Sequence, residues 1–396
     1  MMKHITYSFT WISLRNNSLQ LIMICMACVL FSCIEPYEAA NDEAVEMISI
    51  DASLIKGQDM QAVYISETTS LLNLRYNPVA QCIVSVIDNL GNEFFYTEVE
   101  PGYYTAFIPD ESLIPNRQYK IQVVTPEGSL YESGYEILNQ AADVDTMYYE
   151  VTDLIDKISG EELTGVQFYI DLKASDSISR YFRWKLFETY EYTSIKPVTY
   201  ILTGDTLNPI VNLDNMYEYY RCWKTQKVTR LFLSTTENLV VNEKKKIPLN
   251  FVSTQTDRLK IKYSLQVEQY TLSKGAYLYW QKKKNETQES GGLYTQQPGK
   301  PIGNIQRVGD PSETVLGYFW ASHKTDQRIF VPRDHTLPVN GDYCEAVEFN
   351  PQIHGDGPFP RYVYLDAVRS QALTGADFCF DCRLKNGSTT PPDFWE

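Results

Sequence analysis

The chain has 396 residues, a formal net charge of −15, and 13% aromatic residues. This acidic balance argues against a protein that binds nucleic acid or extended anionic phosphate surfaces. The length allows two domains with hydrophobic cores, and the 29 tyrosines favour β-sheets.

The first 32 residues have the composition of an export signal. Leu19 to Phe31 is apolar apart from Gln20, which is shorter than the ~20 residues that span a bilayer. The sequence LFSC, ending at Cys33, resembles the lipobox of bacterial lipoproteins, whose cysteine is acylated after cleavage. We therefore expect a signal peptide over residues 1–32, a lipid anchor on Cys33 and an acidic tether over residues 33–44. The alternative is an ordinary secretory signal with an incidental cysteine.

Short strands separated by turns are expected from residue 45 to 140. The runs 60–68, 81–88, 93–99 and 118–125 are apolar or alternate, and NLGN at 89–92 is typical of a hairpin turn. This spacing predicts an N-terminal β-sandwich of the Ig-like or transthyretin-like kind. A polar stretch at 139–146 is the expected domain boundary, so this sandwich is expected to fold separately.

Residues 141–396 are expected to form a larger, antiparallel β-rich domain. Strands are predicted at 165–174, 179–194, 258–273, 313–322, 327–332 and 361–367. In the second of these, Arg183 and Lys185 alternate with Phe182 and Trp184, which predicts a sheet with one solvated face. One notable helix is predicted over 273–288, with Ser273 as its N-cap.

Four cysteines of the mature chain are disulfide candidates, because an exported chain meets an oxidising compartment. They are Cys222, Cys344, Cys379 and Cys382, whereas Cys82 lies in an apolar strand pattern and is expected to stay reduced. The pairing is open: in a strand Cys379 and Cys382 would each reach elsewhere, and in a turn they could bridge each other. A zinc site or a redox CxxC pair is the alternative for these last two.

Aromatic residues around a loop-rich stretch form a candidate binding surface. They are Tyr190, Tyr192, Tyr217, Tyr219, Tyr220 and Trp223; ordinary packing in the core and on the sheet is the competing explanation. Three Asp-Ser/Thr-apolar triplets resemble O-glycosylation sequons of Bacteroidota, with Thr146, Ser177 and Thr206 as acceptors.

Motifs for catalysis are missing from the sequence. It contains no HExxH, GxSxG or P-loop pattern, and the histidines of the mature chain are not paired. We expect no enzymatic activity, no cofactor and no metal site. The abundant carboxylates leave a surface hydrolase as a third hypothesis, since a glycosidase pair has no sequence motif.

Several stretches resemble a family of Bacteroidota envelope lipoproteins, the domain-of-unknown-function family DUF4249. They are SCIEPYE at the mature start, RWKLFETYEY, YSLQVEQYTLSKGAYLYWQ, residues 291–322 and the ending CFDCRLKNGSTTPPDFW. The resemblance implies an accessory lipoprotein of the outer membrane whose partner is a TonB-dependent transporter, with a role in substrate capture. It implies no catalytic residue. A structural or adhesive envelope protein is the alternative.

The acidic residues after Cys33 resemble surface-export signals of the same phylum. Glu35, Glu38, Asp42 and Glu43 are the residues concerned. We therefore expect the protein to be anchored in the outer membrane and to face the cell exterior.

The lipid anchor gives a first prediction. Because the thiol of Cys33 is the only acceptor for the acyl chains in the lipobox, Cys33→Ala should move the protein out of the membrane fraction or leave it unprocessed. Fractionation followed by immunoblotting measures this. Ser32→Ala, which keeps a small residue before the cysteine, is the control. A Cys33→Ala protein that is processed to the mature size and still stays in the membrane fraction would contradict the prediction.

Overall fold

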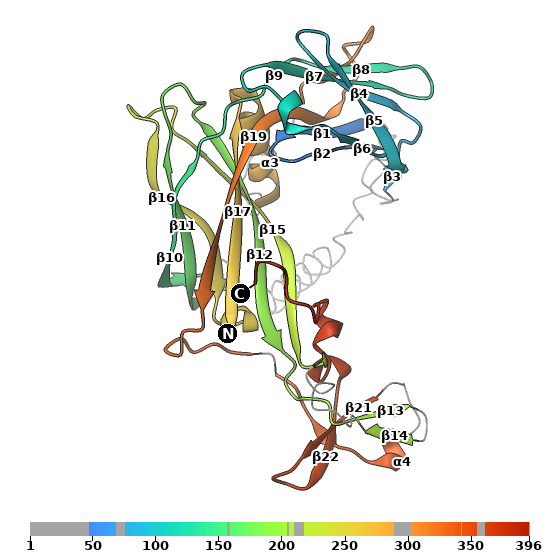
Figure 1. Cartoon of the computed structure of the whole chain (residues 1–396), viewed down its shortest axis with the longest axis vertical. Helices are drawn as coiled ribbons and strands as arrows, with labels where there is room; N and C mark the ends of the chain where they lie inside the picture. The colour runs from blue at the N-terminus through green and yellow to red at the C-terminus, as the bar shows by residue number, and fades with distance from the viewer. Residues whose placement is uncertain are drawn as a thin grey trace, which may run out of the picture. The chain divides into compact units, whose positions relative to one another are not determined.

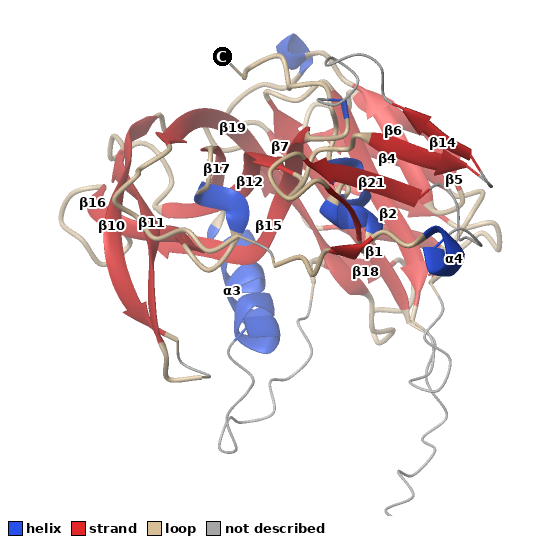
Figure 2. Cartoon of the chain, turned by 90° about the horizontal axis from the view of Figure 1, so that it is seen from below, coloured by secondary structure: helices blue, strands red, loops and turns tan. Residues whose placement is uncertain are grey.

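The computed structural model describes residues 47–68, 76–156, 159–203, 206–209, 218–288, 303–341, 343–354 and 361–395. They belong to one compact unit. Strands dominate it (Figures 1 and 2), which confirms a mainly β fold with one notable helix. The signal peptide, Cys33 and the acidic tether lie outside the described residues.

The strands of residues 48–137 enclose the first core. They are β1 (Ile48–Lys56), β2 (Met60–Glu67), β3 (Asn77–Pro78), β4 (Ile83–Asp88), β5 (Glu93–Glu100), β6 (Tyr103–Phe107), β7 (Gln118–Val124), β8 (Leu130–Ser133) and β9 (Glu136–Ile137). A short 3-10 turn, η1 (Asp110–Ser112), precedes β7. Alternate residues of these strands, such as Val63, Val84 and Ile121, are fully buried in one cluster. The predicted hairpin at 89–92 joins β4 to β5.

Strand β19 (Leu316–Pro332) joins this first region to the rest of the chain. Its first half, from Leu316 to His323, pairs in parallel with β1, and its second half, from Lys324 to Pro332, pairs antiparallel with β17 (Lys262–Leu272). Two strands had been predicted over this range, so the expected break at 323–326 is wrong. Gly317 has φ +95°, and a Cβ there would overlap the carbonyl of Ile50 on β1. A glycine is therefore needed where β19 approaches β1.

The larger region packs two sheets face to face. One contains β15 (Arg221–Thr235), β12 (Tyr181–Thr193), β17 and β19 in that order, and the other contains β10 (Val144–Ile155), β11 (Glu162–Lys173) and β16 (Glu243–Ser253). Phe168 on β11, Trp184 on β12 and Val267 on β17 are buried together between them. A 3-10 turn, η2 (Asp257–Leu259), leads into β17.

The predicted helix is confirmed as α3 (Lys274–Gln288). The hydroxyl of Ser273 accepts the N–H of Ala276 at 3.1 Å, as expected of an N-cap. Trp280 and Tyr279 of α3 pack on Tyr270 and Trp320 of the sheet. The helix therefore covers the face that carries Arg183, and the prediction that this residue is solvated is wrong: only 4% of it is exposed.

A smaller sheet lies near the C-terminus. Its order is β14 (Thr206–Pro209), β13 (Tyr200–Thr203), β21 (Arg361–Asp366), β22 (Gln371–Thr374) and β20 (Val347–Glu348), with the short helix α4 (Pro351–His354) beside it. Val198, Tyr362 and Phe380 form its core. The last regular elements are the 3-10 turns η3 (Asp377–Cys379) and η4 (Cys382–Lys385), and β18 (Ile305–Arg307) pairs with β8.

A buried carboxylate connects β9, β19 and the start of α3. Glu136 accepts hydrogen bonds from the hydroxyls of Tyr318 and Ser273, each at 2.6 Å, and from the amide of Asn304 at 3.3 Å. Burial raises the pKa of Glu136, and these hydrogen bonds offset only part of that effect. Asn304 also accepts the N–H of Phe319 and donates to its carbonyl, so this network holds the first half of β19 in place.

The first core also includes residues from beyond the expected boundary. Ile305, Phe319 and Ala321 are buried among the side chains of β1 to β8. Separate folding of residues 45–140 stays a prediction. A fragment of residues 45–140 should give a cooperative thermal transition, but at a lower temperature than the mature chain, because it lacks these side chains and the β1–β19 pairing.

Circular dichroism of the fragment and of the full mature chain measures that difference. Phe319→Ala in the full chain is the matched change, and it should cost about 3–5 kcal/mol of unfolding free energy because the side chain is fully buried. Equal melting temperatures for the fragment and the mature chain would show that β19 is dispensable for the first core.

Glu136 gives a prediction for pH dependence. Its raised pKa means that the folded state binds the proton more tightly than the unfolded state. Stability from this group is therefore greatest at low pH and is lost as pH rises through the folded pKa. Glu136→Gln cannot ionise, so the difference in melting temperature between this variant and wild type should shift in favour of the variant between pH 4.5 and 7.5. The exposed Glu127→Gln is the control, and a pH-independent difference for Glu136→Gln would contradict the assignment.

Candidate functional site at the disulfide-linked tail

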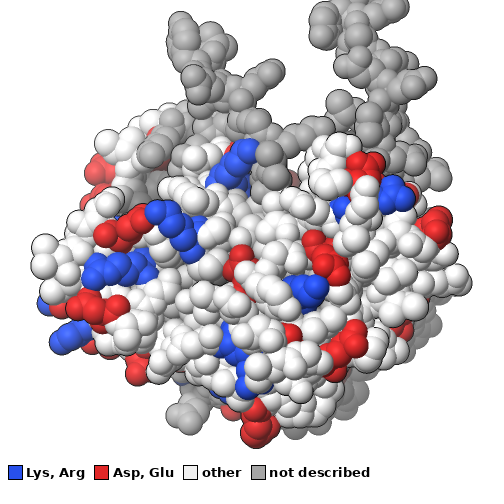
Figure 3. Space-filling model, turned by 90° about the horizontal axis from the view of Figure 1, so that it is seen from above, with Lys and Arg blue, Asp and Glu red and all other residues white. Residues whose placement is uncertain are grey.

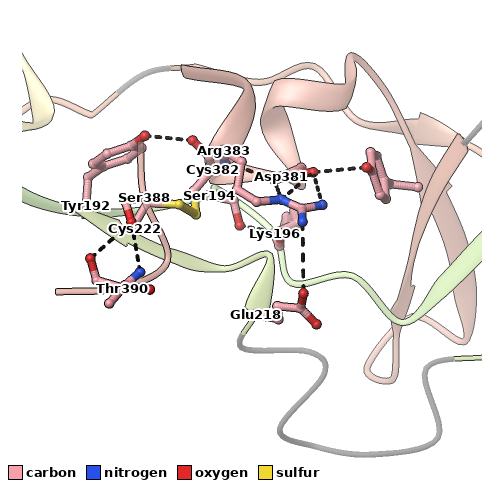
Figure 4. Close-up of a disulfide and its surroundings, with 11 residues drawn as sticks. Tyr192, Ser194, Lys196, Glu218, Cys222, Asp381, Cys382, Arg383, Ser388 and Thr390 are labelled. Carbon is pink, nitrogen blue, oxygen red and sulfur yellow. Dashed lines mark hydrogen bonds and ion pairs between the residues drawn. A yellow bond between two sulfur atoms is a disulfide. The ribbon is translucent and has the colours of Figure 1, made fainter. Parts of the chain in front are cut away.

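The C-terminal tail is fixed to strand β15 by a disulfide between Cys222 and Cys382 (Figure 4). Their Cα atoms are 5.8 Å apart. The hydroxyl of Tyr192 donates to the carbonyl of Cys382 at 2.6 Å, and Trp223 and Ser388 exchange two backbone hydrogen bonds of 2.8 Å. The tail is thus held at three successive points.

The second disulfide joins Cys344 to Cys379, with Cα atoms 5.9 Å apart. All four candidate cysteines are therefore paired, and Cys82 is the buried free thiol, as predicted. Each alternative was right in one part: the two residues lie in successive 3-10 turns, η3 and η4, not in a strand, yet each bonds to a distant cysteine. A zinc or redox CxxC pair does not form, because Cys379 and Cys382 have different partners.

Asp381 organises the turn between the two disulfides. Its buried carboxylate caps η4 by accepting the N–H of Arg383, and it also accepts the Arg383 guanidinium at 2.8 Å and the hydroxyl of Tyr362 at 2.9 Å. Burial raises the pKa of Asp381, but the hydrogen bonds from Arg383 and Tyr362 outweigh it and lower the pKa below its usual value. Figure 4 shows Arg383 between Asp381 and Glu218.

A pocket of about 520 Å³ opens beside this tail. Trp223 on β15 and Trp395 of the tail contribute the aromatic walls, with Pro332 and Pro391. The Trp395 ring packs edge-on against Phe330 at 5.7 Å. Trp395 is half-buried at the end of the sheet, where its ring forms one wall of this pocket.

Polar groups converge on the same pocket. Arg221, Lys262 and Arg333 line it, together with the buried carboxylate of Glu191. Glu191 accepts the indole N–H of Trp395 at 3.3 Å and forms an ion pair with Arg221 at 2.5 Å. The indole Nε1 of Trp223 is buried without a hydrogen-bond partner among the described residues. We call these residues the tail pocket; aromatic walls with a few convergent polar groups are typical of small-ligand sites.

The predicted aromatic surface is only partly present. Tyr190 and Tyr192 are buried in the core between the two sheets of the larger region, so they are not available to a ligand. Tyr219 packs on Tyr362 and under Arg383, whose carbon Cζ is 4.2 Å from its ring. Trp223 is the one predicted residue that lines the tail pocket; Tyr220 is half-buried, and Tyr217 lies outside the described residues. Trp395 was missed as a ligand-facing residue because a terminal aromatic has no periodic context.

A second surface was not predicted. On the outer side of β2, β6 and β5, the large side chains of Met60, Tyr64, Phe95 and Phe107 are 50–66% exposed. Met60 pairs with Phe107, and Tyr64 stacks on Tyr103 at 4.8 Å. We call the four exposed residues the apolar face. The sequence did not indicate this face, because its residues alternate with core residues along each strand, and that pattern is also typical of an ordinary half-buried strand.

Charge is mixed where the first region is viewed from above. Acidic and basic side chains lie next to one another between uncharged residues, without a large area of one sign (Figure 3). The acidic excess of the sequence is therefore not gathered on that side, and electrostatics alone does not define a binding surface there.

The glycosylation candidates lie in different parts of the larger region. Thr146 on β10 and Ser177 in the turn between β11 and β12 are exposed, and the hydroxyl of Ser177 is 2.8 Å from that of Ser175. Thr206 begins β14, and it is described only as part of the strand backbone. Their modification stays a prediction.

The described part of the chain contains neither a metal-binding cluster nor a membrane-spanning helix. Within it, no three His, Cys, Asp or Glu side chains are grouped closely enough to hold a metal ion. None of the helices in those ranges has the length and hydrophobicity to cross a membrane.

These features define a mainly β protein with two disulfides and a structured C-terminal tail. The chain belongs to the family described as a domain of unknown function, DUF4249, whose model matches residues 34–328. The match ends before Arg333, Trp395 and three of the four paired cysteines, so the tail pocket is completed by residues outside it.

Other comparisons add little. No curated protein matches the chain. The crystal structure of trypsin-activated alpha-2-macroglobulin from Escherichia coli is similar over 58% of this chain, with 9% identity and a TM-score of 0.19. This chain spans only 15% of that protein's length, and the likeness carries no argument about fold or function.

The disulfides give a prediction for stability. In the chain-entropy account the loop closed by Cys222 and Cys382, 160 residues apart, contributes about 5 kcal/mol, and the loop of 35 residues closed by Cys344 and Cys379 about 4 kcal/mol. Cys222→Ser with Cys382→Ser should therefore lower the melting temperature more than Cys344→Ser with Cys379→Ser. Both pairs should be compared with Cys82→Ser, which breaks no bond.

Alkylation of the unfolded, unreduced mature protein checks the pairing independently. Mass spectrometry should find a single modified thiol, at Cys82. Three or more free thiols would show that the disulfides do not form in the cell.

Proposed function

We propose that this chain is a lipid-anchored protein of the outer membrane that faces the cell exterior and binds a TonB-dependent transporter. In this role it helps to capture the transporter's substrate. The lipobox at Cys33 supports the anchor, and two disulfides in the C-terminal part suit an oxidising compartment outside the cytoplasm.

The apolar face is the observation that carries the partner assignment. Apolar side chains exposed side by side on a sheet mark interaction surfaces more often than isolated ones. The face lies on β2, β5 and β6, close in sequence to the tether. The 14 residues from Cys33 to Glu46 span at most about 50 Å, which keeps the first region close to the membrane. A membrane-embedded protein is therefore the occupant that the tether favours.

The tail pocket supports the capture role. Its two indoles offer flat apolar surfaces, and Arg221, Lys262 and Arg333 place positive charge at its edge. Such a site suits an amphipathic small molecule that has a flat apolar face and an anionic or hydrogen-bonding edge.

The test uses the apolar face. Phe107→Glu and Phe95→Glu place a charge at exposed positions, so they should leave folding intact and weaken partner binding by about 2 kcal/mol, or roughly thirtyfold. The measurement is the amount of transporter that co-purifies with the tagged protein from native membranes. Val240→Glu, at a site that is 95% exposed on another part of the chain, is the matched control.

Two outcomes would contradict the proposal. One is equal recovery of a transporter with Phe107→Glu and Val240→Glu. The other is the absence of any transporter from the wild-type sample, which would favour a structural or adhesive role. Protection of the mature protein from proteinase in intact cells would separately place it on the periplasmic side and remove the capture role.

A further inference from the structure

A buried cation with unused hydrogen-bond donors lies beneath helix α3. The guanidinium of Arg183 is stacked on Trp280, with Cζ 3.5 Å from the ring centroid, and Trp320 is 5.2 Å away. Stacking satisfies the flat faces of a guanidinium but not the N–H groups along its edge. Two of its nitrogens, Nε and Nη1, are buried and have no hydrogen-bond partner among the described residues.

No carboxylate forms an ion pair with Arg183 in the described structure. The nearest acidic groups act on it only through longer-range attraction, and one of them, Glu268, already accepts Lys324 at 3.0 Å and the hydroxyl of Tyr270 at 2.6 Å. Burial lowers the pKa of Arg183 to about 10. A guanidinium that stays charged at neutral pH without a counter-ion is costly, so it is expected to have a partner.

Further basic side chains lie next to it. Arg183, Lys185, Lys227 and Arg230 line one cavity of about 150 Å³, and none of its lining residues is acidic. Burial and the charge of Arg183 lower the pKa of Lys185 to about 8. Lys227 and Arg230 are exposed, so one side of the cavity opens to solvent while Arg183 lies inside.

An irregularity in the sheet makes room for this cavity. The register of β12 against β15 shifts between Trp184 and Leu186, which pair with Phe232 and Val228 respectively. Three residues of β15 therefore lie opposite Lys185 alone. Such bulges often occur beside functional sites, because they redirect side chains and interrupt the ladder.

We propose that this cavity binds a small, multiply charged oxyanion, a phosphate or sulfate group, through Arg183, Lys185 and Lys227. Arg183 offers its fork of N–H donors, and the two lysines offer point charges. A divalent anion suits several unneutralised cations better than a single carboxylate would. The cavity volume admits a group of this size, whereas a nucleotide would extend into solvent. This basic site is confined to one cavity, although the chain as a whole carries a net negative charge.

Inorganic phosphate and sulfate are the probes. At constant ionic strength and up to about 10 mM, each should raise the melting temperature of the mature protein in a saturable way, and chloride should not. Isothermal titration calorimetry gives the affinity. Lys185→Met should weaken phosphate binding about tenfold or more, and Lys227→Met about three- to tenfold. Lys245→Met, an exposed lysine on β16, is the matched control and should leave the affinity unchanged.

Lys227→Met keeps the test independent of folding, because Lys227 is exposed and its loss should not affect stability without phosphate. The absence of a saturable shift in wild type would overturn the proposal. Equal affinities for Lys185→Met, Lys227→Met and Lys245→Met would also overturn it, since binding would then lie elsewhere on the surface.

A second experiment distinguishes a lipid headgroup from a soluble anion as the ligand. Vesicles that contain phosphatidic acid should sediment the protein, and inorganic phosphate should release it, if the ligand is a lipid headgroup with a terminal phosphate. Vesicles of phosphatidylcholine are the control. Binding of inorganic phosphate without sedimentation assigns the site to a soluble ligand, and both results support an oxyanion site.

Discussion

The structure depends on one strand that joins two groups of strands into a single sheet. Strand β19 pairs in parallel with β1 through its first half and antiparallel with β17 through its second half. Since backbone N–H and C=O groups must be paired when buried, this single run of residues closes the β1 side through its first half and the β17 side through its second half. Glu136 and Asn304 fix the first half of β19 by hydrogen bonds, and Trp320 of the same strand packs against α3. The apolar face and the tail pocket are both positioned by elements that this strand connects.

Local patterns predicted much of the fold but not its connections. The helix with its Ser273 cap and the alternating strands around Phe168 and Trp184 could be read from the sequence, because period and capping are local properties. β19 could not, since Ser322 to Asp326 resembles a turn when only neighbouring residues are considered. Arg183 was misplaced for a related reason: whether the polar side of a strand meets water or a helix is decided by tertiary contacts. Strands β15 and β16 were not predicted, because charged residues interrupt the alternation of apolar and polar residues that is typical of a strand.

The same distinction between local patterns and tertiary contacts applies to the candidate site. Composition and export context identified which four cysteines would be oxidised, but their pairing depended on where two 3-10 turns place them. Among the described residues of the predicted aromatic surface, only Trp223 lies in the tail pocket. Trp395 is brought there by the tail, and Glu191 by the end of β12. The tail pocket, the apolar face and the oxyanion cavity use different chemistry.

Under the export that we propose, the pairing of β1 with β19 has a consequence for the order of folding. A chain that crosses a membrane from its N-terminus presents β1 on the far side long before Leu316 follows. Until then the edge of β1 that faces β19 is an open strand edge, able to pair with another chain. The first core likewise waits for Phe319, and the bond to Cys382 waits for almost the last residues to arrive. Completion of the fold therefore depends on the C-terminal residues. If the proposed export holds, a periplasmic chaperone that shields an unpaired strand would have a defined segment of this protein, Ile48 to Lys56, to protect.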